Sequence, residues 1–149
     1  MPPESSRTSL AALLDAAAAK VERLTPQQAL AASQQDALVV DIRADLDRQR
    51  YGIVPGSLHI PRTVLEWRFD PQGHWRSPHI GGTDQRLVLI CEDGCSSLLA
   101  AAVLVDLGYR RAGDVIGGFV AWRHETLPVA TAPEPHRRGE LAGMRPPDA

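Results

Sequence analysis

Both cysteines of the chain lie in one short segment, LVLICEDGCSSLLAAAVL, residues 87–104. An apolar run ends at Cys91, and a second apolar run, rich in alanine and leucine, begins at Leu98. If the turn between the two runs curls around Cys91, free backbone N–H groups and the positive end of the following helix favour the thiolate over the thiol. The segment therefore predicts a nucleophilic cysteine at position 91 that needs no neighbouring base.

The residues that follow Cys91 are the predicted backbone donors: Glu92, Asp93, Gly94, Cys95, Ser96 and Ser97. The two carboxylates in this set oppose a thiolate unless their charges point into water. A competing interpretation is that Cys91 is inert packing, because cysteine is among the most frequently buried residues. Cys95 is interpreted as an ordinary loop thiol, since closing a disulfide across three intervening residues would require the loop to deform.

The bulk composition is that of one soluble globular domain. The chain has 149 residues, of which 44% are apolar and 23% charged, and a net charge of −2. This balance argues against nucleic acid or an anionic membrane as the main partner. No apolar stretch reaches the length of a membrane helix, and residues 9–24 carry charges that favour an amphipathic helix over a signal sequence. We therefore expect a cytoplasmic protein with two free thiols.

Short apolar runs alternate with helical segments along the chain. We expect strands at 38–42, 57–60, 87–90 and 112–116. We expect helices from Ser6 or Thr8 to about Arg23, from Thr25-Pro26, over 62–68, over 98–107 with Ser96 or Ser97 as its cap, and over 119–125. The alternation predicts an α/β domain with a central parallel sheet flanked by helices on both faces. The expected organisation is a helical extension at 1–24, a domain at 25–130, and a disordered tail at 131–149 that is rich in proline, arginine and glycine.

Polar side chains at the end of the 38–42 strand form a second candidate site. Asp41 and Arg43 could contact a ligand, but we favour a structural pair that caps neighbouring loops. Three histidines stand within the next forty residues: His59, His74 and His79. Their spacing matches no zinc pattern, so no metal site is predicted.

Four segments together resemble the single-domain rhodanese sulfurtransferases. They are VVDIR at 39–43, YGIVPGSLHIP at 51–61, CEDGCSS at 91–97 and GGFVAW at 117–122, in the order and at the spacing of that family, across residues 25–128. The resemblance implies a rhodanese-like α/β fold and places Cys91 at the position of the catalytic cysteine. It implies that Cys91 takes a sulfane sulfur from thiosulfate or another persulfide-type donor and passes it to cyanide or a thiol, without a cofactor.

The chain departs from this family pattern at the loop. Ser96 stands where many members have an arginine, which would grip a dianionic donor. Three arginines that precede the loop in sequence could supply the positive charge across the mouth of the site instead: Arg62, Arg68 and Arg76. The alternative is that they are solvated surface residues. Val54 also stands where the family often has histidine, whereas His59 is interpreted as a packing or turn residue.

Two other functions compete with sulfur transfer. One is a non-catalytic rhodanese-like module, which carries sulfur or binds a partner protein that bears a persulfide. The other is a phosphatase or arsenate reductase with a Cys-x5-Arg loop. We discount the second because Ser97 occupies the arginine position and because the two loop carboxylates would repel an oxyanion. In all of these readings Phe119 and Trp122 are core anchors of the last helix.

Overall fold

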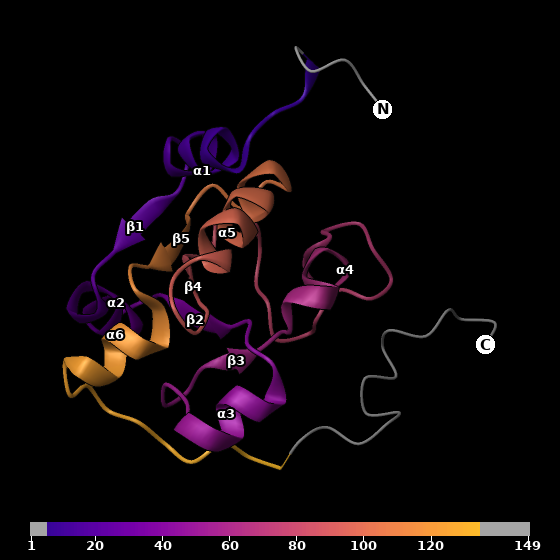
Figure 1. Ribbon diagram of the computed structural model, residues 1–149. Coiled ribbons are helices and arrows are strands. Elements are labelled where there is room, and N and C mark those ends of the chain that lie inside the picture. Colours follow the sequence, from indigo (N-terminus) through magenta and orange to yellow (C-terminus); the bar gives the residue numbers. More distant parts are fainter. Residues whose placement is uncertain (1–5, 135–149) are drawn as a thin grey trace.

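The computed structural model describes residues 6–134, which form a five-stranded parallel sheet surrounded by helices (Figure 1). The strands are β1 (Glu22–Leu24), β2 (Leu38–Asp41), β3 (Leu58–His59), β4 (Leu87–Ile90) and β5 (Ala112–Val115), in the spatial order β1-β5-β4-β2-β3. The helices are α1 (Leu10–Ala18), α2 (Pro26–Ser33), α3 (Asp45–Tyr51), α4 (Leu65–Phe69), α5 (Ser96–Asp106) and α6 (Gly118–His124), with a short 3₁₀ helix at Arg62–Val64 before α4. The predicted α/β fold with a parallel sheet is confirmed. Most of the predicted disordered tail, residues 135–149, lies outside the described residues.

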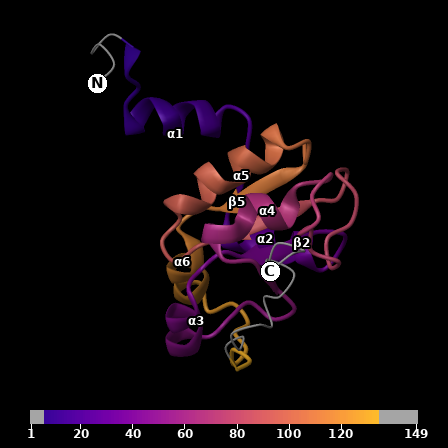
Figure 2. The same ribbon diagram turned by 90° about the vertical axis from the view of Figure 1, so that its right-hand side faces the viewer.

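The N-terminal segment differs from its prediction. Ser9, rather than Ser6 or Thr8, caps α1 by accepting the N–H of Ala12 on its side-chain oxygen at 3.0 Å. The helix ends at Ala18 instead of running to about Arg23, and the following residues form β1, which pairs with β5 at the edge of the sheet. Helix α1 packs along α5 (Figure 2). A strand of three residues is too short to show a period-2 pattern, so tertiary pairing decided what local sequence could not.

Helix α2 begins where the Thr25-Pro26 pair predicts. The Thr25 hydroxyl accepts the N–H of Gln28 at 3.2 Å, and the Gln28 side chain accepts the N–H of Thr25 at 3.0 Å. This reciprocal cap satisfies two N–H groups that the helix cannot bond internally. The cap therefore fixes the start of α2 directly after the end of β1.

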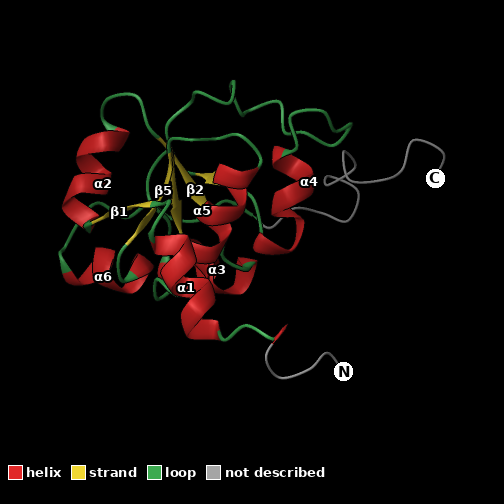
Figure 3. Cartoon of the chain, turned by 90° about the horizontal axis from the view of Figure 1, so that it is seen from above, coloured by secondary structure: helices red, strands yellow, loops and turns green. Residues whose placement is uncertain are grey.

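The sheet separates two apolar layers. Viewed from above, α2 and α6 lie on one side of the strands, and α4 and α5 lie on the other (Figure 3). Alternation along β4 supplies both layers, since Leu87 and Leu89 pack with α1, α4 and α5, whereas Val88 and Ile90 pack with α2 and α6. A strand buried on both faces reads as a continuous apolar run, which is why β4 was predictable from sequence.

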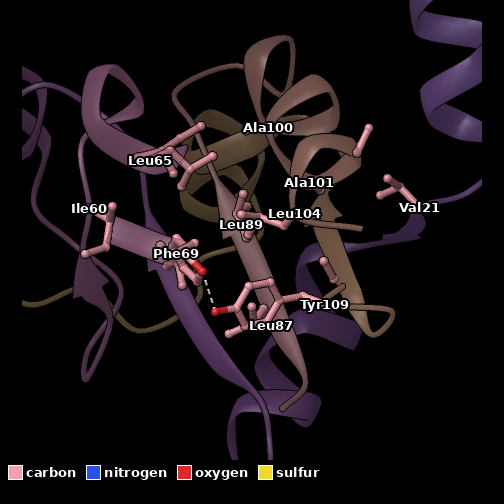
Figure 4. Close-up of a cluster of buried hydrophobic side chains, with 14 of the residues drawn as sticks. Val21, Ile60, Leu65, Phe69, Leu87, Leu89, Ala100, Ala101, Leu104 and Tyr109 are labelled. Carbon is pink, nitrogen blue, oxygen red and sulfur yellow. Dashed lines mark hydrogen bonds between the residues drawn. The ribbon is translucent and has the colours of Figure 1, made fainter. Parts of the chain in front are cut away.

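Two aromatic side chains pack against each other in the apolar layer that contains α4 and α5 (Figure 4). The rings of Phe69 and Tyr109 meet edge to face, with their centroids 5.4 Å apart. The buried Tyr109 hydroxyl donates to the carbonyl oxygen of Phe69 at 2.6 Å, so this polar group is not left without a partner. The contact ties α4 to the segment that follows α5.

Candidate functional site

Cys91 lies where the central strand β4 ends, in the loop that leads into α5. This edge of the sheet is where parallel α/β folds bind their ligands. The Cys91 side chain is buried, and the backbone N–H of Gly94 donates to its Sγ at 3.1 Å. Gly94 adopts a φ of 87°, a left-handed conformation that favours glycine and turns the loop back over the sulfur.

The other predicted donors are used in different ways. The N–H of Cys95 donates to the Asp93 side chain at 3.3 Å. Neither serine caps α5, which begins at Ser96 and has no side-chain cap bond, so that prediction was wrong. Ser97 is instead fully buried, and its hydroxyl donates to Asp114 Oδ2 at 2.8 Å, because a buried carboxylate requires donors. Direct donation to the sulfur from loop residues other than Gly94 stays a prediction.

The first backbone N–H groups of helix α6 donate hydrogen bonds to the cysteine loop. The N–H of Phe119 donates to the carbonyl oxygen of Cys91 at 2.8 Å, and that of Val120 donates to the carbonyl oxygen of Glu92 at 2.9 Å. These groups have no partner within the helix itself, so the loop carbonyls satisfy them. Phe119 and Trp122 are both buried in the adjacent apolar layer, as predicted for core anchors.

The close approach of α6 to the loop depends on two glycines. A Cβ on Gly118 would lie 2.5 Å from the carbonyl oxygen of Cys91 and 2.7 Å from the nitrogen of Gly94. A Cβ on Gly94 would lie 2.6 Å from the nitrogen of Gly117. The clashing atoms are all backbone atoms, which cannot rotate away. Gly118 of the GGFVAW segment and Gly94 of the loop therefore let the two backbones come into direct contact.

Arginine side chains hold the loop carboxylate Glu92. Its Oε2 accepts from Arg43 Nη1 at 3.1 Å, and its Oε1 lies 3.8 Å from Arg123 Nη2. The Arg43 guanidinium also stacks over the Phe119 ring, 4.0 Å from the ring centroid. Glu92 is thus ion-paired with two arginines from other segments, although its Oε1 is buried and accepts no hydrogen bond from the described residues.

The Asp41–Arg43 pair has the structural role that the sequence favoured. Arg43 Nε donates to Asp41 Oδ1 at 3.0 Å and Arg43 Nη2 donates to Oδ2 at 2.9 Å, and both side chains are buried. Arg48 Nε donates to the same carboxylate at 3.3 Å. His59 packs beside this cluster, with its Nε2 2.8 Å from the carbonyl oxygen of Arg43, and burial lowers the pKa of the His59 imidazole. A role for Asp41 or Arg43 in binding substrate stays a prediction.

The three arginines that were expected near the mouth contact residues of their own segment. Arg62 pairs with Glu66 at 2.8 Å. Arg68 donates to the carbonyl oxygen of Trp75 at 2.8 Å. Arg76 donates to the carbonyl oxygens of Ile80 and Gly81. These bonds link residues within 62–81, and none of the three guanidinium groups is seen to contact the cysteine loop within the described residues.

A cation that does reach the loop, Arg23, was not singled out from sequence. Arg23 lies on β1, and its Nε and Nη2 donate to the two carboxylate oxygens of Asp114 at 2.9 and 3.0 Å. Nη2 also donates to the carbonyl oxygen of Gly94, in the cysteine loop, at 3.2 Å. The hydrogen bond to Asp114 raises the pKa of Arg23. Arg23 was missed because its strand was predicted as helix, and Arg123 lay unremarked in the last helix.

Cys95 differs from Cys91 in exposure and environment. Its thiol is exposed, and the side-chain hydrogen bond with Asp93 raises its pKa. A raised pKa leaves less thiolate at neutral pH, and the thiolate is the nucleophile. We therefore expect Cys95 to be less reactive at neutral pH than an exposed cysteine without a neighbouring carboxylate.

We expect Asp93→Asn to make Cys95 react faster with iodoacetamide at neutral pH, because the substitution removes the carboxylate that raises the pKa of the thiol. The measurement is the alkylation rate between pH 6 and pH 10 in a Cys91→Ser background, in which Cys95 is the single thiol of the chain. The pH at half-maximal rate should fall. Asp84→Asn, remote from the loop in sequence, is the control, and equal shifts in both variants would contradict the assignment.

Two further observations bear on the kind of site. Among the described residues, no group of three or more His, Cys, Asp or Glu side chains is arranged to hold a metal ion. None of the helices between residues 6 and 134 has the length and apolar character needed to cross a membrane.

Comparison with known proteins agrees with this geometry. The rhodanese-like domain family model matches residues 25–125. Thiosulfate sulfurtransferase GlpE of Haemophilus influenzae (strain PittEE) is 32% identical over 111 residues, which are 74% of this chain and 96% of that protein. The GlpE protein of Pseudomonas fluorescens is 37% identical over 115 residues, which are 74% of this chain and 92% of that protein.

Solved structures share the fold. A protein of unknown function from Rhodopseudomonas palustris, described as a possible tyrosine phosphatase, has 34% identity and a TM-score of 0.77 over 87% of this chain and 99% of that one. The human single-domain sulfurtransferase TSTD1 has 23% identity and a TM-score of 0.58 over 71% of this chain and 96% of its own. The family model matches residues 25–125, and the alignments cover nearly the full length of both GlpE proteins. The chain therefore belongs to the family of rhodanese-like domains.

Proposed function

We propose that the protein is a sulfurtransferase that moves a sulfane sulfur through a persulfide on Cys91. The Cys91 thiolate attacks the outer sulfur of thiosulfate, or of another persulfide-type donor, and forms an S–S bond. The electron pair of the broken bond leaves with sulfite when the donor is thiosulfate, and with the donor's own thiolate when the donor is a persulfide. Cyanide or a thiolate then attacks the outer sulfur of the persulfide. That attack regenerates the Cys91 thiolate and releases thiocyanate or a new persulfide.

The observation that carries the proposal is the 3.1 Å contact from the Gly94 N–H to Cys91 Sγ. A terminal persulfide sulfur is anionic and gains more from fixed N–H donors than from a general base. The donor here is held in place by the backbone contacts of Gly94 and Cys91 with Gly117, Gly118 and Phe119. This N–H is thus in place beside the sulfur before the reaction begins.

The Rhodopseudomonas relative raises phosphoryl transfer as a second candidate. A dianionic phosphoryl group is usually gripped by a guanidinium that donates two parallel hydrogen bonds. At the position where a Cys-x5-Arg loop has that arginine, this chain has Ser97, whose hydroxyl is bonded to the buried Asp114 carboxylate. This favours sulfur transfer over phosphoryl transfer.

The donor is a small sulfur compound or a partner protein that carries a persulfide, the acceptor is cyanide or a thiol, and no cofactor takes part. A non-catalytic sulfur carrier is the alternative, in which the persulfide forms but does not turn over. A cytoplasmic location is proposed from the two unpaired cysteines.

The test is intact-mass analysis after incubation with thiosulfate. We expect wild-type protein to gain the mass of one sulfur atom, and Cys91→Ser to gain none while Cys95→Ser behaves as wild type. Addition of cyanide should remove the extra mass and release thiocyanate. A persulfide that survives cyanide would favour the carrier alternative, and absence of any adduct with thiosulfate or polysulfide would contradict the sulfur-transfer proposal.

A further inference from the structure

A cavity of about 600 Å³ borders the cysteine loop on the side of the N-terminal helix. Its walls are mainly apolar and come from Leu10 and Leu14 of α1 and from Leu98 and Leu99 of α5. The loop residues 94–96 also line it. The volume lies within the range of pockets that hold small organic ligands, and mostly apolar walls with a few polar groups are typical of such pockets.

Gly94 belongs both to the wall of the cavity and to the turn around Cys91. Gly94 lines the cavity, and its N–H donates to Cys91 Sγ at 3.1 Å. A ligand that contacts Gly94 therefore contacts the residue whose N–H is bonded to the reacting sulfur. The outer wall, α1, precedes the residues 25–125 that the family model matches, so this half of the cavity is an addition to the matched domain.

The charges around the cavity disfavour an anionic ligand. Arg23 is the cation among the residues that line it, and its Nε and Nη2 already bind Asp114 and the carbonyl oxygen of Gly94. Asp15 of α1 adds an exposed carboxylate to the rim. A ligand with an apolar body and no negative charge of its own suits this combination better than a small dianion does.

We propose that this cavity binds the acceptor of the sulfur, and that the acceptor is a low-molecular-weight organic thiol with an apolar body and no anionic group. The inference rests on the proposed function. The apolar body lies between α1 and α5, and the acceptor thiolate, its proton given up to water, attacks the outer sulfur of the Cys91 persulfide. An S–S bond forms to the acceptor, the S–S bond to Cys91 breaks, and Cys91 leaves as the thiolate.

The test compares three acceptors on protein loaded with thiosulfate: benzyl mercaptan, 2-mercaptoethanol and the anionic 3-mercaptopropionate. Benzyl mercaptan should have the lowest KM of the three, about tenfold or more below that of 2-mercaptoethanol, because its ring buries apolar surface in the cavity. A KM for 3-mercaptopropionate equal to or below that of benzyl mercaptan would overturn the proposal.

A pair of matched variants on α1 locates the effect. Leu10 lines the cavity and Leu13 does not, although both are exposed leucines of the same helix, at 63% and 47% of their surface. Leu10→Ser should raise the KM for benzyl mercaptan about fivefold, by removing apolar contact area, whereas Leu13→Ser should leave it unchanged. Equal KM values in the two variants would overturn the assignment of the cavity.

Failure of the sulfur-transfer proposal itself is measured separately. Persulfide formation is read by intact mass without any acceptor, so its absence contradicts the proposed function alone. Titration calorimetry of benzyl mercaptan with the Cys91→Ser variant measures whether the cavity binds this thiol in the absence of turnover. We expect Leu10→Ser to weaken this binding in the Cys91→Ser background, and binding that is undetectable or insensitive to Leu10→Ser would overturn the cavity assignment even if the persulfide forms.

Discussion

Cys91→Ser is expected to lower the rate of thiocyanate formation from thiosulfate and cyanide by about a thousandfold or more, because a serine hydroxyl is neither ionised at neutral pH nor able to hold a sulfane sulfur. The substitution replaces one buried atom by a smaller one. It changes the partner of the Gly94 N–H, whereas the contacts of Gly118 and Phe119 with the loop involve backbone atoms that stay in place. The measurement is the initial rate of thiocyanate release, with circular dichroism to establish that the variant is folded.

The control is Cys95→Ser, which should retain most of the activity. Cys95 is exposed, and its pKa is raised by Asp93, so it supplies little thiolate at neutral pH. Loss of activity in Cys95→Ser comparable to the loss in Cys91→Ser would mean that two thiols are required, and it would contradict a mechanism with one persulfide. Substantial activity in Cys91→Ser would contradict the assignment of the nucleophile.

Gly118→Ala is expected to destabilise the fold by about 3 kcal/mol, because backbone strain and overpacking act together at this position. The new Cβ would meet the carbonyl oxygen of Cys91 at 2.5 Å and the nitrogens of Gly94 and Asp93 at 2.7 and 2.8 Å, and φ is +61°. Relief of the clash requires the loop to move away from α6, so the activity of the folded fraction should fall as well. Urea denaturation and the specific activity of folded protein measure the two effects.

Gly56→Ala separates strain from collision. Gly56 also has a positive φ, +77°, but a Cβ there would meet no atom within 4 Å. This variant should lose about 1 kcal/mol, the conformational part alone, and keep its activity. If the two variants lost the same stability, the close packing of the loop on α6 would not be what makes Gly118 necessary.

Much of the scaffold was predictable because its signals are local. The buried run at 87–90, the Thr25-Pro26 helix start and the position of Cys91 directly after a strand depend on residue types within a few positions of each other. The α/β class followed from the alternation of such segments. The family resemblance rested on four short motifs, and the rhodanese-like family model matches the same part of the chain.

What escaped prediction depends on partners distant in the chain. β1 exists because it pairs with β5, and Arg23 reaches the loop only from that strand. Ser97 looks like a helix cap in sequence, yet the carboxylate of Asp114 captures its hydroxyl. Glu92 was expected to oppose the thiolate unless its charge pointed into water. It forms ion pairs instead with arginines from two other segments, and no local sequence pattern indicates these partners.

The supports of the cysteine loop also have a consequence for synthesis of the chain. Asp114, which holds Arg23 across 91 positions, and the Gly117-Gly118 pair all follow Cys91 in the sequence. As the ribosome makes the protein from its N-terminus, Cys91 is added to the chain before any of these groups, and contacts between distant residues form late. The nascent thiol thus passes through a period without its enclosure, and a chain truncated before residue 114 would carry the nucleophile without the structure that directs it.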